Sequence, residues 1–311
     1  DLNFIDIFKQ MKYEGHPCLW YLIIAPFAKL GFPYITQNII SWIIMNVCAW
    51  IVIKKAPFNI CIKCLILLTP PFIYLYSVIS RSYCLIAIAI VLIASTYKDR
   101  KINPIKYTLS ILLLANTHVI MLGLSMMLYA VFFIEELLIK FKEKTKEEKR
   151  NIIISLIINI IGVAFLLIQL AGCLQTNANV NSEFKISTNI FDSIWRTILQ
   201  IVTLFARQEL KYPIIILLIT FFIYEFIRHT KNAIIIFVSI FFQLLIYVLI
   251  YSVSEQRAAT VFLIIMMFLW MQNEEIEKVR DLNIKNLFIK ILFFILLFLY
   301  TLNSWKIIEQ D

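Results

Sequence analysis

The stretch IIISLIINIIGVAFLLIQLA, residues 152–171, contains no charged side chain. A helix rises about 1.5 Å per residue, so twenty residues cover roughly the 30 Å hydrocarbon core of a membrane. The rest of the chain is similar, with 61% hydrophobic and 16% charged residues among 311. A soluble domain has about 45–50% apolar and about 25% charged residues. The sequence therefore predicts an all-α protein, a polytopic bundle of transmembrane helices.

Apolar residues gather in about ten segments that we expect to cross the membrane: 37–53, 59–78, 82–97, 105–115, 119–139, 152–171, 213–227, 233–250, 258–271 and 287–302. Lysine and arginine concentrate in alternate connections, at 54–55, 98–101, 140–150, 228–231 and 278–285. Connections of this kind stay in the cytoplasm. The opposite connections are therefore predicted to face the extracytoplasmic side of a cell membrane, with a bacterial plasma membrane as the expected location.

Two shorter helices are expected before the first span. Residues 1–13 carry apolar side chains at helical spacing, and residues 17–30 are apolar but too few to cross, since about 20 are needed. We expect an extracytoplasmic part, 1–36, with these juxtamembrane helices, and a transmembrane domain, 37–311. The outer loop 172–211 of that domain is predicted to contain a surface helix over 191–205. Because the sequence begins at Asp1 and not at Met, we expect an amino-terminal portion to be missing.

A polar stretch, YEGHPCLWY at residues 13–21, leads into the second of these short helices. Glu14 and His16 flank Gly15, and Pro17 suits the first turn of a helix, where its missing N–H would have no partner. The stretch therefore predicts a carboxylate and an imidazole at the mouth of a helix, on the extracytoplasmic side.

The segment 105–115 is short, and it meets the next segment at Asn116-Thr117-His118. Eleven helical residues rise only some 16 Å, so this turn should lie below the outer surface. Polar groups at that depth face either protein or a water-filled cavity. Asn116 and His118 are therefore candidates to line a cavity, or else packing residues that are hydrogen-bonded between helices.

Two arginines are predicted at the outer ends of spans. Arg81 lies in the run Ser80-Arg81-Ser82-Tyr83, and Arg257 follows Glu255 and Gln256. The planar fork of donors on arginine suits phosphate. Two outward arginines and a histidine therefore predict a site for a phosphate-bearing lipid. The alternative is that each arginine only anchors its span at the head-group level.

The stretch 13–21 resembles the end of the first outer loop in the GT-C superfamily of polytopic glycosyltransferases, in its aminoarabinose-transferase and protein-mannosyltransferase branch. The runs 80–83 and 116–118 and the late Arg257 follow in the order found in a bacterial subgroup. The chain departs from the pattern at His16, where related enzymes carry lysine, and at Cys18, where they carry a second proline. The acidic pair of the superfamily would precede Asp1.

The resemblance implies transfer of a sugar from a polyprenyl-phosphate-linked donor to an extracytoplasmic glycolipid, polysaccharide or protein. Glu14, or an acidic residue upstream of Asp1, would be the base or a ligand of a divalent metal ion, which the sequence leaves open. His16 would be the second catalytic residue. Groups that would bind the lipid phosphate are Arg81, Tyr83, Asn116, His118 and Arg257.

Two other classes remain open at this point. A transporter or lipid flippase for cell-envelope precursors often has interrupted helices in matching halves, and the break at 116–118 has no counterpart in the sequence. A polysaccharide polymerase or ligase would share the donor lipid. The sequence has no Gly-rich phosphate loop or nucleic-acid-binding motif, so no nucleic-acid partner is expected. The spacing of Cys61 and Cys64 is that of a CxxC pair, but no second pair accompanies it.

Overall fold

The computed structural model describes residues 4–11, 16–79, 81–171, 190–205, 208–249, 253–276 and 291–303, and within these ranges it is helical with no strand. Its α-helices are α1 (Phe4–Met11), α2 (Leu19–Lys29), α3 (Thr36–Lys55), α4 (Ile60–Leu67), α5 (Tyr83–Tyr97), α6 (Pro104–Ala115), α7 (Leu122–Phe133), α8 (Lys146–Leu170), α9 (Ile190–Phe205), α10 (Lys211–Arg228), α11 (Thr230–Leu249), α12 (Glu255–Ile276) and a last helix, Ile291–Asn303. The predicted all-α class is confirmed.

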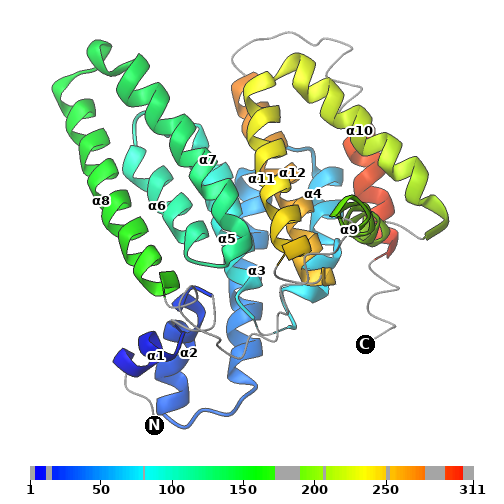
Figure 1. Ribbon diagram of the computed structural model, residues 1–311, viewed down its shortest axis with the longest axis horizontal. Coiled ribbons are helices and arrows are strands. Elements are labelled where there is room, and N and C mark those ends of the chain that lie inside the picture. Colours follow the sequence, from blue (N-terminus) through cyan, green and yellow to red (C-terminus); the bar gives the residue numbers. More distant parts are fainter. Residues whose placement is uncertain are drawn as a thin grey trace.

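Helix α5 lies at the centre of the bundle (Figure 1), where it packs against α3, α6 and α12. Eleven of its fifteen residues are buried, on all sides of the helix. A helix that is apolar all round is stable only when other elements surround it. The short predicted segment 82–97 is therefore an internal helix whose neighbours are mostly protein.

Four helical segments among the described residues are long and apolar enough to cross a membrane: Thr36–Lys55, Val119–Ile139, Lys146–Leu170 and Thr230–Leu249. Large apolar side chains stay exposed on them, such as Trp42 on α3 and Ile161 and Ile168 on α8. Water would not tolerate so much exposed apolar surface on several neighbouring helices, whereas lipid chains would. The structure therefore supports a membrane protein.

The predicted segment 59–78 is not one continuous helix. Helix α4 ends at Leu67, and a π-helical turn, η1, covers Pro71–Leu75. Two consecutive prolines, Pro70 and Pro71, cause the break, because proline lacks an N–H and restricts the residue before it. The Tyr76 N–H reaches back five residues to the Pro71 carbonyl, at 3.2 Å. The predicted segment is therefore helical on both sides of an interruption at the two prolines.

Helix α2 ends in a turn that reverses the chain toward α3. Gly31 has φ +78°, a left-handed conformation that glycine adopts without strain. The Gly31 N–H donates to the Ala28 carbonyl, and the Phe32 N–H donates to the Phe27 carbonyl, both at 3.1 Å. The Phe27 and Phe32 rings meet edge to face at 5.8 Å. These are the bonds and the apolar contact of a Schellman motif.

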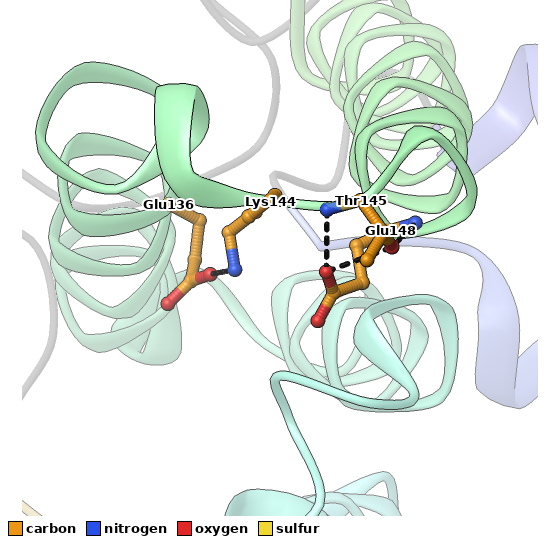
Figure 2. A network of polar contacts seen from close by, with 4 residues as sticks. All are labelled: Glu136, Lys144, Thr145 and Glu148. Carbon is orange, nitrogen blue, oxygen red and sulfur yellow. Dashed lines mark hydrogen bonds and ion pairs between the residues drawn. The ribbon is translucent and has the colours of Figure 1, made fainter.

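The connection between α7 and α8 is held by two sets of polar contacts (Figure 2). Glu136 lies in a π-helical turn, η3 (Ile134–Ile139), and forms a buried ion pair with Lys144. Thr145 and Glu148 form a capping box at the start of α8, in which the Thr145 N–H donates to Glu148 Oε2 at 2.8 Å. This turn fixes one end of the bundle. We call it the basic end, because Arg100, from the connection before α6, and Lys231, from α11, lie there with Glu135 around a single cavity.

The amino-terminal helices pack at the opposite end of the bundle. Figure 1 places α1 and α2 beneath the end of α8 that lies away from the α7–α8 turn. The Phe8 and Phe165 rings, from α1 and α8, are 5.6 Å apart. The predicted helices in 1–13, 17–30 and 191–205 are present as α1, α2 and α9.

Candidate functional site

Four aromatic rings lie next to one another in a row at the end of the bundle opposite the basic end; the first three are stacked, and the His16 ring is tilted against that of His118. The Tyr76 ring, just after η1, is 5.6 Å from that of Tyr83, the first residue of α5. Tyr83 stacks on His118 at 5.6 Å, and His118 lies 4.6 Å from His16. Tyr76, Tyr83 and His118 are buried, with exposed fractions of 0%, 3% and 4%. The row therefore brings together four separate parts of the chain.

His118 has a fixed role for one of its two ring nitrogens. It lies between α6 and a 3₁₀ turn, η2 (Val119–Met121), with extended backbone. Its Nδ1 accepts a hydrogen bond from the Ile120 N–H at 3.3 Å, so the ring acts as an N-cap. A nitrogen that accepts a hydrogen bond carries no proton. The neutral ring therefore carries its proton on Nε2, which makes Nε2 a donor.

Two arginines act on the histidine pair. Arg257, in the first turn of α12, is half-buried, and its carbonyl accepts hydrogen bonds from Tyr247 Oη at 2.9 Å and Thr260 Oγ1 at 2.6 Å. Its charge lowers the pKa of both His16 and His118. Arg81, just before α5, is exposed and lowers the pKa of His16. The site is therefore cationic through its arginines.

The histidines themselves are neutral near pH 7. Burial is the main cause that lowers the pKa of His16, from 6.5 to about 4, followed by the charges of Arg257 and Arg81. Burial likewise brings the pKa of His118 well below its usual range, with smaller effects from His16 and Arg257. Two neutral imidazoles beside two guanidinium groups give a site that donates hydrogen bonds and attracts anions.

Gln169, in the last turn of α8, contacts the segment that carries His16. Its Oε1 accepts from the Cys18 N–H at 3.0 Å and from Cys18 Sγ at 2.9 Å. Cys18 and Gln169 are both buried, with exposed fractions of 2% and 8%. A buried N–H without a partner costs about 1–3 kcal/mol, so this amide oxygen stabilises the segment where it lies. Cys18 thus helps to position the predicted polar stretch.

The structure brings some of the predicted site residues together and leaves others apart. His16, Tyr83, His118 and Arg257 lie together, and Arg81 lies within electrostatic reach. Asn116 is half-buried, and its Nδ2 donates to the Leu112 carbonyl at 2.9 Å, so it closes the end of α6. Glu14 lies outside the described residues.

Three site residues were absent from the predictions made from sequence: Tyr76, Tyr247 and Gln169. The two tyrosines are buried, and their hydroxyls donate to the backbone carbonyls of Gln256, at 2.7 Å, and Arg257. A buried tyrosine hydroxyl needs a partner. The sequence could therefore have indicated these tyrosines, because each lies near the end of an apolar segment, although it could not have indicated their hydrogen-bond partners.

Within the described residues, no group of three His, Cys, Asp or Glu side chains is arranged to hold a metal ion. The two histidines of the site have no carboxylate as a common third ligand there. The described part of the site, with two arginines and the Nε2–H donor of His118, suits an anion.

The fold and the site define a class: a helical protein with membrane-compatible helices and a cationic, aromatic site at one end. No protein-family model, no curated protein and no solved structure matches the chain.

Proposed function

We propose that the protein is a membrane glycosyltransferase that transfers a sugar from a polyprenyl-phosphate-linked donor to an extracytoplasmic acceptor. The observation that carries the proposal is the convergence of His16, His118 and Arg257 at one end of an apolar bundle, with Arg81 in electrostatic reach. A lipid phosphate at the head-group level would meet donors and positive charge there, while its chain stays among apolar helices. The resemblance of the stretch 13–21 to the first outer loop of GT-C enzymes supplies the type of reaction.

In the proposed reaction, an oxygen or nitrogen of the acceptor attacks the anomeric carbon of the donor sugar. The bond between that carbon and the phosphate oxygen breaks, and its electron pair leaves with the lipid phosphate. Positive charge from Arg257 and Arg81 stabilises the negative charge that develops on the phosphate. The Nε2–H of His118 is a further donor toward it. The proton of the acceptor goes to a carboxylate, the role that the resemblance assigns to Glu14 or to an acidic residue upstream of Asp1.

All ten predicted segments cross the membrane in this proposal. Helix α5, with fifteen residues, is short for a span, yet it is enclosed by other helices. Only helices in contact with lipid must match the thickness of the hydrocarbon core. The acceptor is a glycolipid, a cell-surface polysaccharide or a protein, and the partners are the donor lipid and the surrounding membrane lipids.

The test is transfer of the sugar from a polyprenyl-phosphate sugar by the purified full-length protein. We expect Arg257→Gln and Arg81→Gln to slow transfer by roughly tenfold to a hundredfold, the equivalent of a charged hydrogen bond of about 1.5–3 kcal/mol. Arg196→Gln is the matched control, because Arg196 is exposed on α9 and pairs with Asp192. Unchanged transfer in both site variants, with normal expression, would exclude the assigned site.

Glu14→Gln tests the base separately. Loss of a catalytic base slows a reaction by roughly 10²–10⁴. If Glu14→Gln transfers sugar normally while the arginine variants do not, the base is a residue other than Glu14, and the phosphate site stands.

A lipid flippase is the second candidate, because the break between α4 and η1 adds a second interrupted segment to the one at 116–118. Interrupted helices are typical of transporters. The described polar groups at the α4 break do not form a comparable site: the Thr69 hydroxyl donates to the Ile66 carbonyl at 2.6 Å. Proteoliposomes with donor lipid distinguish the two, since a flippase moves the lipid without consuming its sugar.

A further inference from the structure

A buried carboxyl group lies between α10 and α12, away from the histidine pair. Glu225, in the last turn of α10, is 0% exposed. Gln272 of α12 is 5% exposed, and its Nε2 donates a hydrogen bond to Glu225 Oε2. Gln272 follows Arg257 by fifteen positions on α12, which corresponds to about 22 Å along a helix. The proposed sugar transfer uses neither Glu225 nor Gln272.

The second oxygen of this carboxyl group is buried without a partner. Among the described residues, Glu225 Oε1 makes no hydrogen bond. A carboxylate that is removed from water is unstable without a cation or several hydrogen-bond donors. Its position adds to this cost, because the last turn of a helix is the negative end of the helix dipole. The surroundings of Glu225 therefore favour the neutral, protonated form of the carboxyl group.

The neighbouring helices supply no counter-ion to Glu225 within the described part of the chain. On α11, Lys231 forms an ion pair with Glu135, and on α9, Arg196 forms one with Asp192. Close to Glu225 in sequence, the other titratable or charged side chains are those of Tyr224, exposed Arg228 and His229. The side chains of Glu274 and Glu275, further along α12, and the connection 277–290 lie outside the described residues. Burial and the hydrogen bond from Gln272 are therefore the described influences on the charge of Glu225.

Gln272 can bond to this carboxyl group with or without the proton. Its Nε2 donates to a carboxylate oxygen, as the structure shows. Its Oε1 can accept from the O–H of the protonated acid once the amide has turned over. A lysine or an arginine at this position would hold the carboxyl group in its charged form, whereas a neutral amide does not. The pair can therefore gain or lose a proton and keep its hydrogen bond.

We propose that Glu225 and Gln272 form a proton-binding site between α10 and α12, in which Glu225 holds a proton in near-neutral solution. The proton comes from water and returns to it. Its release leaves a negative charge in an apolar contact, and this charge weakens the packing of α10 on α12. Ionisable side chains inside membrane bundles mark functional sites for this reason. The site is independent of sugar transfer.

The experiment records infrared spectra of the detergent-purified full chain as the pH is raised. Ordinary glutamate side chains have lost their proton by about pH 6. In the wild type we expect the C=O band of a protonated carboxylic acid to remain at about pH 6 and to disappear in alkaline buffer. Glu225→Gln should abolish this band. Glu147→Gln, the matched control at an exposed glutamate of α8, should keep it.

Gln272→Leu identifies the band even if Glu225→Gln does not fold. This variant should keep the band and shift its frequency upward, because the acid loses its hydrogen-bond partner. The proposal is overturned if the wild type has no band at about pH 6 that either substitution changes. Glu225 would then be an ionised group with a cation as its partner.

Stability gives a second measurement of the same proton. Where the folded protein holds a proton that the unfolded chain has released, each pH unit raises the equilibrium constant of unfolding by up to tenfold. The wild type should therefore lose stability relative to Glu225→Gln as the pH rises from about 5 to 7. His16 and His118 are present in both proteins, so their effects cancel in the difference. A difference that does not change with pH would contradict the proton-binding site.

Discussion

His118 uses its two ring nitrogens for different purposes. Nδ1 caps the start of η2 by accepting a hydrogen bond from the Ile120 N–H. Nε2 carries the proton and is the hydrogen-bond donor of this ring, which lies between the rings of Tyr83 and His16. This division separates a structural role from a functional one within a single side chain. Two substitutions can therefore remove one role at a time.

We expect His118→Asn to keep the fold and lose function, because Asn Oδ1 can accept the same N–H from Ile120 while Nε2 is removed. Sugar transfer should fall roughly tenfold to a hundredfold, as for a charged hydrogen bond. Both His118→Asn and His118→Gln lose the buried ring, and His118→Gln also loses the cap, so His118→Gln should be the less stable of the two by about 1 kcal/mol in thermal unfolding. Equal transfer by His118→Asn and wild type would show that Nε2 does not act on the substrate.

The pKa of His16 predicts how stability changes with pH. The folded value is about 4, below the ordinary 6.5. Between these values the unfolded chain binds a proton that the folded protein does not, so the free energy of unfolding rises with pH. Stability should therefore fall as pH is lowered from about 6.5 to 4, and His118 acts in the same direction. Thermal unfolding in detergent across this range measures the slope.

His16→Gln should make that slope shallower, while His118 keeps part of it. A slope identical to that of the wild type would contradict the assignment of His16 as a buried neutral group. The prediction concerns stability alone, so it holds whether the site transfers sugar or moves lipid.

At the residue scale, sequence could name His16, Arg81, Tyr83, His118 and Arg257 because each is a polar residue at the end of an apolar segment. Alternating basic loops then predicted that these ends share one side. The residues with which these side chains form hydrogen bonds inside the bundle could not be predicted from the sequence. Tyr76 bonds to a carbonyl 180 residues away, and Cys18 bonds to Gln169, 151 residues away. Such pairings depend on which helices pack together, and the pattern of hydrophobic residues does not specify that packing.

At the scale of elements, apolar length located the helices but not their neighbours or their continuity. In the segment 59–78, Pro70 and Pro71 already argued against a continuous helix, and α4 ends just before them. Helix α5 is central because it is apolar on every side. That property was visible in the sequence, although several other segments share it, so composition alone could not identify the central helix.

Helices α7 and α11 approach closely at Gly123, and this contact predicts a difference between two glycines. A Cβ at Gly123 would lie 2.6–2.7 Å from the Cβ, Cγ and Cδ1 of Phe242, atoms close to the α11 backbone. We expect Gly123→Ala to force the helices apart and destabilise the protein by roughly 1–2 kcal/mol, the overpacking cost less the gain in helix propensity. The midpoint of thermal unfolding measures the loss.

Gly162→Ala is the matched control in α8. Its Cβ would meet the two Cδ atoms of Leu112, the far end of a flexible side chain, at 2.5–2.6 Å. Leu112 can change rotamer, and alanine favours the helix, so the net change should stay within roughly 0.5 kcal/mol. Equal destabilisation by both substitutions would contradict a specific α7–α11 contact.

The two ends of the molecule carry different polar and charged groups. One end carries neutral histidines and two arginines, and the other carries the buried Glu136–Lys144 pair and the loops rich in lysine. The positive-inside rule assigns the basic end to the cytoplasm. If so, the donor lipid of the proposed reaction would meet the histidine pair on the extracytoplasmic side.

Cysteine labelling in intact cells tests this orientation. The native cysteines Cys61, Cys64 and Cys173 are first replaced by alanine. Among the described cysteines, Cys61 and Cys64 are exposed, whereas Cys18, Cys48 and Cys84 are buried. A membrane-impermeant maleimide should then label Arg196→Cys, whose native side chain is 75% exposed on α9, without permeabilisation. Lys142→Cys, at the basic end, should react only after the cells are opened, because the cationic loops are retained in the cytoplasm. Labelling of both positions in intact cells would contradict the predicted topology. Labelling of Lys142→Cys alone would invert it, and the histidine pair would then face the cytoplasm, where an extracytoplasmic acceptor could not reach it.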